Sequence, residues 1–300
     1  MKEKINDKIA VKPMKRRKKL NSINAFDVIL SIVMILFMAT IVLPFIHIIA
    51  VSFSGSGAVM RGEVGFIPVD FSIYTYKEIF KDGAFFTAYG NTIYYTVVGT
   101  FLNLLVTSTG AYALSRRQMV GHKLYSMMIT ITMFFGGGMI PTYIAMSSYQ
   151  LIDTRWVMIL PGLVSTWNLI VMRSFFISYP QEIIESGQLD GLRDPGVFFR
   201  LVLPTSKASL ATIGLYYAVA HWNAYMNARL YIRDEALYPV QHLLQKMLDT
   251  AGTDSGDEGK LVGLTVRYAS IIISVVPIMC VYPWLQKYFV KGAMVGAVKG

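Results

Sequence analysis

One long apolar run, from Ile29 to Val51, constrains the fold of this chain more than any other feature. About 20 apolar residues in a helix cross the hydrocarbon core of a bilayer, and this run is too long for the core of a signal peptide. Five further apolar segments follow, near residues 92–114, 124–146, 156–176, 210–231 and 264–284. The composition agrees, because 15% of the residues are charged, against about a quarter in soluble domains. The sequence therefore predicts an all-α membrane protein with six transmembrane helices.

The positive charges predict how these helices cross the membrane. Nine Lys and Arg residues lie within the first nineteen positions and form a tail that is too polar to pack. With this tail inside, the inner segments hold eighteen Lys and Arg residues and the outer segments hold seven. Because Lys and Arg are enriched on the cytoplasmic side, we expect both termini in the cytoplasm. We expect no nucleic-acid binding by the tail, because an apolar run follows it and no recognition fold does.

A polar stretch between two apolar segments, residues 181–204, predicts a compact helix–turn–helix on the cytoplasmic side. Pro180 suits the first turn of a short helix, and the pair Asp190–Gly191 then breaks it. Asp194 is expected to cap a second helix with Pro195 at its first position, and Leu203–Pro204 to end that helix. Such a knob suits the docking of a soluble partner, and the alternative is a loop that only joins two spans.

The glycine run Gly136–Gly138, followed by Pro141, interrupts the third apolar segment. No phosphate-binding glycine motif surrounds it, so we expect a broken or sharply bent transmembrane helix. Backbone that is not helical is tolerated at membrane depth only against protein or water. The break is therefore interpreted either as part of a transport pathway or as a packing kink.

No pattern of catalytic or metal-binding residues occurs in the chain. The four histidines are scattered, there is no ATP-binding loop, and the single cysteine, Cys280, excludes an internal disulfide. We expect no enzyme activity, no bound metal and no cofactor on this chain. If transport is active, its energy must come from another polypeptide.

Six polar or aromatic residues within the fourth and fifth apolar segments are candidates for a solute pathway. Aromatic faces and neutral hydrogen-bonding groups suit a sugar, whereas the alternative role of such side chains is packing between helices. If the fifth segment is one helix, positions 216, 220, 223 and 227 share a face. The candidates are Trp167, Asn168, Tyr216, His221, Trp222 and Asn223.

The polar stretch resembles the EAA motif of bacterial ABC importer permeases, in which Glu-Ala-Ala precedes Asp-Gly-Ala and a later Leu-Pro. Glu185, Asp190, Gly191, Leu203 and Pro204 match that pattern, while Ser186, Gly187 and Leu192 stand where the motif has alanine. The last residues, Val298, Lys299 and Gly300, resemble the tail of the maltose-type G subunit. The segment from Phe134 to Ile144 is similar to the LplB/YtcP-like branch of oligosaccharide permeases.

This resemblance implies the type I ABC importer permease fold in the bacterial cytoplasmic membrane, with a cytoplasmic coupling helix. Its implied partners are a second homologous permease, two cytoplasmic ATP-binding subunits that carry ATP and Mg, and an extracellular solute-binding protein. The matching residues named above, Val298–Gly300 included, would then contact the ATPase. The expected solute is an oligosaccharide, and the alternatives are an amino acid, a polyamine or phosphate, or a membrane scaffold or sensor without transport.

We accordingly divide the chain into three parts. Residues 1–26 form the basic cytoplasmic tail, residues 27–290 the six-span permease domain with its coupling region at 181–204, and residues 291–300 a cytoplasmic tail.

Overall fold

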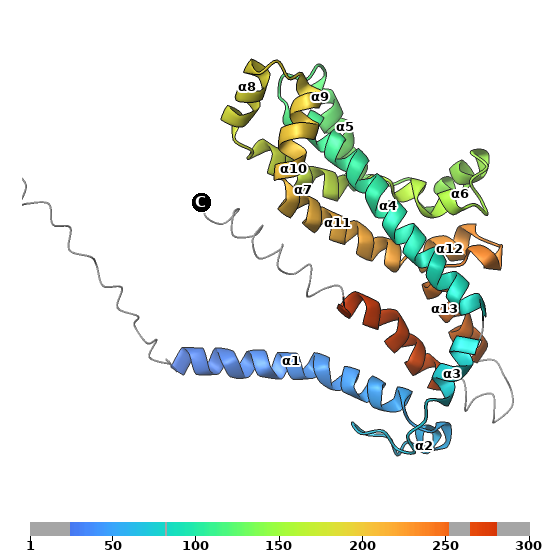
Figure 1. The fold of residues 1–300 in the computed structure, drawn as a ribbon. Helices are drawn as coiled ribbons and strands as arrows, with labels where there is room; N and C mark the ends of the chain where they lie inside the picture. Colours follow the sequence, from blue (N-terminus) through green and yellow to red (C-terminus); the bar gives the residue numbers. More distant parts are fainter. Residues whose placement is uncertain (1–24, 82, 252–264, 281–300) are drawn as a thin grey trace, which may run out of the picture. The chain divides into compact units, whose positions relative to one another are not determined.

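The computed structural model describes residues 25–81, 83–251 and 265–280, and within these ranges it contains helices, turns and loops but no strand. The chain divides after Ile46 into two units, which are described separately. Figure 1 shows the course of the helices. The chain-terminal predictions for Val298, Lys299 and Gly300 lie outside the described residues.

The helical segments follow one another with short connections. In chain order they are α1 Ala25–Ser52, α2 Ser56–Met60, α3 Tyr74–Lys81, α4 Gly83–Ser115, α5 His122–Phe134, α6 Met139–Ser148, η1 Arg155–Met158, η2 Leu160–Gly162, α7 Thr166–Ile177, α8 Gln181–Leu189, α9 Asp194–Val197, η3 Phe198–Val202, α10 Leu203–Thr205, α11 Lys207–Trp222, α12 Tyr225–Tyr231, η4 Glu235–Leu237 and α13 Val240–Ala251. A further apolar helix, Thr265–Cys280, follows.

Two of these helices, α1 and α4, are long and apolar enough to cross a membrane by themselves. The pair α5 and α6 and the pair η1–η2 and α7 add two more if each bent pair is one span. The helix Thr265–Cys280 is apolar but shorter. Length and composition thus support up to four spans in the described residues, where the sequence predicted six.

The predicted break at the glycine run is confirmed. Helix α5 ends at Phe134, α6 begins at Met139, and the two axes meet at 118°. Gly138 has a φ of +83°, which residues other than glycine rarely adopt. The turn between the two helices therefore includes the extended Phe135 and the positive φ of Gly138.

The prediction of one continuous helix in the fifth apolar segment is wrong. Helix α11 ends at Trp222, and α12 begins at Tyr225. The Asn223 side-chain amide donates to the carbonyl oxygen of Val219 at 2.8 Å, and the Asn223 backbone N–H donates to the same oxygen at 3.1 Å. An asparagine that bonds to its own backbone favours helix ends over helix interiors. Positions 223 and 227 therefore do not continue the α11 face that carries Tyr216.

The shorter elements add detail to the six predicted apolar segments. The first half of the fourth apolar segment forms the short 3₁₀ turns η1 and η2, and the helix starts only at Thr166. Helix α13 lies between the fifth and sixth apolar segments, and its Val240 and Leu244 are buried against other apolar side chains. The short helix α3 lies just before α4.

Helix α4 lies at the centre of the second unit, packed along α11 and α7 (Figure 1). In its first half, two side chains satisfy the backbone of the segment around the 3₁₀ turn η4, which is not α-helical. The Asn91 amide donates to the carbonyl oxygens of Ala236 and Tyr238, and the Tyr95 hydroxyl donates to that of Leu237 at 2.9 Å. Carbonyl groups without partners are costly inside a protein, so these bonds allow the chain to leave helical structure there.

Further along α4, Asn103 does the same for the turn between η2 and α7. Its amide donates to the carbonyl oxygens of Gly162 and Leu163, both at 2.7 Å. Its own oxygen lies 2.7 Å from the His221 Nε2 on α11. Asn103 is fully buried, so its amide and carbonyl are both used within the protein.

A second hydrogen-bonded group joins the same three elements. The hydroxyl of Tyr217 on α11 lies 2.7 Å from that of Thr107 on α4 and accepts the backbone N–H of Ser165 at 2.9 Å. The Ser165 side chain in turn accepts the N–H of Asn168 and begins α7. Polar side chains between α4 and α11 thus position the start of α7.

Asp153, in the loop between α6 and η1, is bonded to the loop that follows α12. Its carboxylate accepts the backbone N–H groups of Arg233 at 2.8 Å and Asp234 at 2.9 Å, and its own N–H donates to Tyr231. The bond from Asp234, followed by that from Arg233, lowers the pKa of Asp153 below its ordinary value of 3.8. The charged form of this carboxylate therefore favours the folded state.

This lowered pKa predicts how acid affects stability. A carboxylate with a depressed pKa in the folded state stabilises above its ordinary pKa, and this contribution is lost as the pH falls through the depressed value. We expect the unfolding temperature of the natural protein to fall more steeply below about pH 4 than that of Asp153→Asn. Thermal unfolding of the purified protein in detergent, measured at a series of pH values, tests this. Parallel curves for the two proteins would contradict it.

Candidate functional site

The candidate site is the compact helical knob formed by residues 181–205, which comprises α8, α9, η3 and α10. One side of the knob is apolar and lies against the ends of α4, α7 and α11. Its buried members pack with side chains of all three helices. The cluster contains Ile184, Val197, Phe198 and Val202 of the knob with Tyr112, Met172, Phe176 and Ile213. Close packing therefore joins the knob to all three helices.

The turn after α8 matches the prediction from Asp190–Gly191. Asp190 ends the helix, and Gly191 has a φ of +83°. The N–H of Leu192 donates to the carbonyl oxygen of Gly187, and the N–H of Gly191 to that of Gln188, both at 3.0 Å. These two bonds form a Schellman motif, which ends a helix with a left-handed residue.

The second helix of the knob differs slightly from the prediction. Arg193 is the capping residue, and Asp194 is already the first residue of α9, with Pro195 following. The helix widens to a π-turn at Phe198–Val202 and continues through Pro204 to Thr205. A proline removes one backbone donor and crowds the preceding turn, and a wide turn before it relieves that crowding.

Gly187 stands where the family motif has alanine, and the structure shows close packing there. A Cβ at Gly187 would lie 2.5 Å from the Leu201 Cδ1. The two helices of the knob therefore approach each other closely at this glycine.

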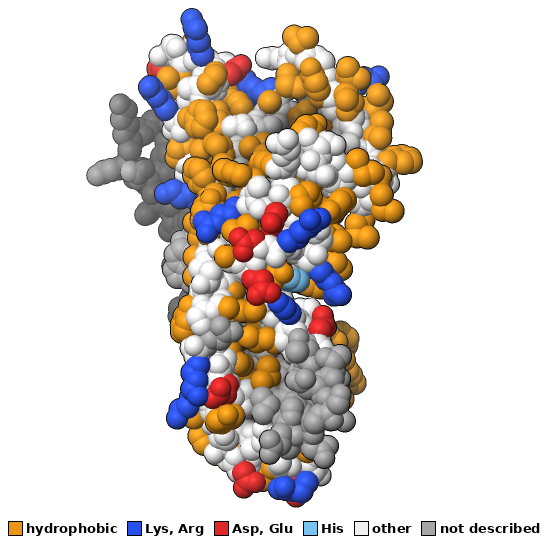
Figure 2. Space-filling model, turned by 90° about the vertical axis from the view of Figure 1, so that its right-hand side faces the viewer, with side chains coloured by type: hydrophobic (Ala, Val, Ile, Leu, Met, Phe, Trp, Pro, Cys, Tyr) orange, Lys and Arg blue, Asp and Glu red, His pale blue; other side chains and the backbone are white. Residues whose placement is uncertain are grey.

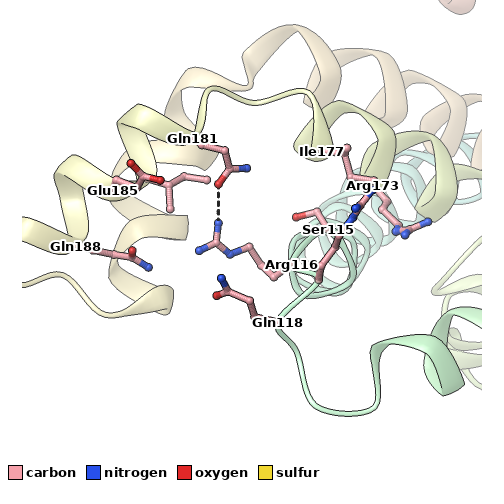
Figure 3. A pocket seen from close by; sticks show the side chains of 10 residues that line it. Ser115, Arg116, Gln118, Arg173, Ile177, Gln181, Glu185 and Gln188 are labelled. Atoms are coloured by element: carbon pink, nitrogen blue, oxygen red, sulfur yellow. Dashed lines mark hydrogen bonds between the residues drawn. The ribbon is translucent and has the colours of Figure 1, made fainter.

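A hollow of about 420 Å³ separates α8 from the ends of α4 and α7. Figure 3 shows Arg116 extending from the end of α4 towards α8, where Gln181 meets it at 3.4 Å. A second, longer contact joins Arg116 to Asp194 at 3.8 Å. The hollow is lined by Ser115, Arg116, Arg117, Gln118, Arg173, Ile177, Gln181, Ile184, Glu185 and Gln188. We call it the arginine hollow.

The structure brings the predicted coupling residues of the described range together in this knob. Glu185 lines the arginine hollow, Asp190 and Gly191 form the exposed turn, and Leu203 packs at the edge of the apolar cluster. Pro204 is exposed near the end of the second helix.

Two residues of the site were missed by sequence reasoning. Leu189, the last residue of α8, is 89% exposed beside the turn, whereas Ile184, Val197, Phe198 and Val202 of the knob are buried. Arg116 directly follows the last residue of α4, far from the knob in sequence, and meets the knob only through the fold. An apolar residue on the polar side of an amphipathic helix was the available signal for Leu189.

The six candidate pathway residues do not share one environment. His221 is buried and bonded to Asn103, and the Trp222 indole N–H donates to the Ser274 carbonyl oxygen at 3.1 Å. Asn168 is buried at the start of α7, whereas Trp167 is 59% exposed. Tyr216 and Asn223 are exposed. Two of the candidates thus make contacts between helices.

The turn at Gly191 provides a test of the knob. We expect Gly191→Val to destabilise the protein by about 2 kcal/mol and to reduce binding of a partner at the knob, because a β-branched residue is strained at positive φ. No atom lies within 4 Å of a Cβ at this position, so the effect comes from the backbone alone. Gly191→Asn is the matched control, because asparagine adopts this conformation more readily. Equal unfolding temperatures for the two variants would show that the turn is not strained.

The surface of the molecule is rich in apolar side chains. Figure 2 shows one face on which hydrophobic side chains cover wide areas, interrupted by a band of acidic and basic side chains. Large hydrophobic residues are exposed on α5 and α6 in particular, among them Leu124, Met128, Ile140 and Ile144. Apolar areas of this extent indicate contact with lipid or with another protein.

Comparison with known proteins identifies the family, although no protein-family model matches the chain. The chain is 38% identical over 281 residues to the polygalacturonan/rhamnogalacturonan transport system permease protein YtcP of Bacillus subtilis, covering 92% of this chain and 98% of that protein. It is 39% identical to protein LplC of the same organism, covering 87% of this chain and 90% of LplC. A crystal structure of a bacterial ABC transporter that imports the acidic polysaccharide alginate contains a chain with 33% identity and a TM-score of 0.82, covering 90% of this chain and 98% of that chain. The chain therefore belongs to the carbohydrate permease subunits of ABC transporters, which are multi-pass membrane proteins and not enzymes themselves.

Proposed function

We propose that this chain is one of two permease subunits in an importer for oligosaccharides, and that it crosses the bacterial cytoplasmic membrane six times with both termini inside. The charge bias of the sequence supports the orientation, since eighteen of its Lys and Arg residues fall on the proposed inner side and seven on the outer side. The names of two relatives support a carbohydrate as the solute, since they give polygalacturonan, rhamnogalacturonan and alginate as the transported polysaccharides. No residue pattern favours an amino acid or a polyamine.

The proposed mechanism is mechanical coupling through the knob. Two cytoplasmic ATP-binding subunits would carry ATP and Mg, and each would hold the knob of one permease. When the ATPase subunits close on ATP, they would move the knobs, and the spans would change between outward and inward openings. The single observation that carries this proposal is the apolar cluster, which packs the knob onto α4, α7 and α11. The Val298–Gly300 tail is proposed to reach the same interface.

The solute pathway is a separate part of the proposal. Trp167 and Tyr216 offer exposed aromatic faces, and Asn223 an exposed amide, that suit the ring faces and hydroxyl groups of a sugar unit. His221 and Trp222 would support the pathway without contacting the sugar through their polar atoms, because these atoms already contact Asn103 and Ser274. An extracellular solute-binding protein would deliver the sugar.

Two measurements test this proposal. Tagged, full-length protein purified from its own membranes is expected to carry a second permease and an ATP-binding subunit, identified by mass spectrometry. Cells that lack the chain are expected to lose uptake of uronate-containing oligosaccharides while uptake of amino acids and polyamines stays normal. Purification without an ATPase, or unchanged oligosaccharide uptake, would refute the proposed function.

A further inference from the structure

The arginine hollow is a concentration of positive charge at one end of the helical unit. Arg116 and Arg117 directly follow the last residue of α4, and Arg173 lies on the last turns of α7. Glu185 is the one acidic residue in the lining, and Asp194 lies nearby at 3.8 Å from Arg116. The lining thus has three guanidinium groups against one carboxylate, which leaves an excess of positive charge.

The guanidinium groups of the hollow are only partly engaged within the chain. Arg116 makes the two long contacts to Gln181 and Asp194 and lies 6.0 Å from the centre of the Tyr112 ring. The Arg173 Nε donates to the Leu114 carbonyl oxygen at 2.9 Å, and its Nη2 lies 3.5 Å from the His122 Nε2. Arg117 has no ion pair with any other described residue. Each guanidinium carries five N–H donors, so several of them are available to a ligand.

The space and chemistry of the hollow suit a phosphate group. Its volume of about 420 Å³ falls within the roughly 300–1,000 Å³ of small-ligand sites. Guanidinium groups bind phosphate in a two-pronged arrangement, and glutamine amides add neutral donors. Figure 3 shows Gln181 and Gln188 on α8 on the side of the hollow opposite the end of α4.

The position of the hollow indicates where such a phosphate comes from. It lies at the ends of two helices that are candidate membrane spans, α4 and the bent pair with α7. In the orientation proposed above, on which this inference rests, these ends meet the inner surface of the membrane. Basic pockets between helices at that surface bind the headgroups of anionic lipids.

We propose that the arginine hollow binds the phosphate of an anionic phospholipid headgroup. The lipid would sit between the spans and α8 and would contact both, through Arg116 and Arg117 on one side and the α8 glutamines on the other. Anionic lipid would therefore hold the knob at a defined position relative to α4 and α7.

Lipid binding by the full-length protein tests this inference. The probes are dioctanoyl phosphatidylglycerol, dioctanoyl phosphatidylcholine and inorganic phosphate, added to protein purified with its natural subunits in detergent. We expect phosphatidylglycerol alone to raise the unfolding temperature and to remain attached in native mass spectrometry. We expect Arg117→Gln to weaken that binding about tenfold, because one charge-assisted contact is lost. Arg200→Gln is the matched control, since Arg200 is exposed on η3 and outside the hollow.

Three results would overturn the proposal. Equal binding of phosphatidylcholine would show that charge plays no part, and equal stabilisation by inorganic phosphate would assign the hollow to a free anion. Binding that is absent from the complex and appears only after the ATPase subunits are removed would assign the hollow to an acidic side chain of that partner. None of these readouts depends on transport, so a failure of the proposed import function would be recognised separately by the purification and uptake measurements.

Discussion

Replacing Gly99 with alanine is expected to destabilise the protein by about 3 kcal/mol, although alanine favours a helix over glycine by about 1 kcal/mol. A Cβ at this position would lie 2.4 Å from the His221 Nε2 and 2.6 Å from its Cε1. The imidazole is buried between α4 and α11, and a shift of the ring away from Gly99 would lengthen its 2.7 Å bond to Asn103. Asn103 in turn holds the carbonyl groups of Gly162 and Leu163, so the damage extends to the start of α7.

The chain contains a matched control for this change. Gly90 lies in the same helix, and a Cβ there meets nothing within 4 Å. We expect Gly90→Ala to leave stability unchanged or to raise it by up to about 1 kcal/mol. In a His221→Ala background, adding Gly99→Ala is expected to cost less than about 1 kcal/mol, because the clash is gone. Thermal unfolding in detergent measures all four variants. Equal effects of Gly99→Ala and Gly90→Ala would disprove the close contact.

Replacing Leu189 with aspartate is expected to abolish co-purification of the ATP-binding subunit while leaving the fold intact. Leu189 is 89% exposed at the end of α8, so the free protein gains nothing from its apolar side chain. If the side chain fills a pocket of the partner, its removal costs about 2–3 kcal/mol, and a buried charge in its place costs more. Together these effects correspond to a loss of affinity of about a hundredfold or more.

Ile67→Asp provides the comparison for Leu189→Asp. Ile67 is 76% exposed in the loop before α3. The proposed topology places this loop on the outer side of the membrane, away from the ATPase. We expect this variant to retain the ATPase at the natural level, and both variants to unfold at the temperature of the natural protein. Retention of the ATPase by Leu189→Asp would show that the end of α8 is not at the interface.

Local sequence chemistry was sufficient for several features of the fold. The length of the run at 29–51 predicted α1, the glycine run predicted the break between α5 and α6, and Asp190–Gly191 predicted the turn of the knob. In each case the cause acts within a few residues along the chain, either as the bilayer-matched length of an apolar helix or as the backbone freedom of glycine. The residues that match the EAA motif also indicated the family from the amino-acid sequence alone.

Contacts between distant segments decided the rest. The 3₁₀ turns before α7 depend on partners that sequence spacing does not reveal, since Asn103 of α4 satisfies carbonyl groups 59 and 60 residues away. His221 is a polar residue within an apolar segment, and the sequence therefore suggested that it lines the pathway. Only the fold shows that its ring lies against Gly99 and is hydrogen-bonded to Asn103. The sequence by itself determined which segments are apolar helices and where glycine turns them. The tertiary structure decided which polar groups face one another, because a buried polar atom takes its partner from whatever the packing brings within about 3 Å.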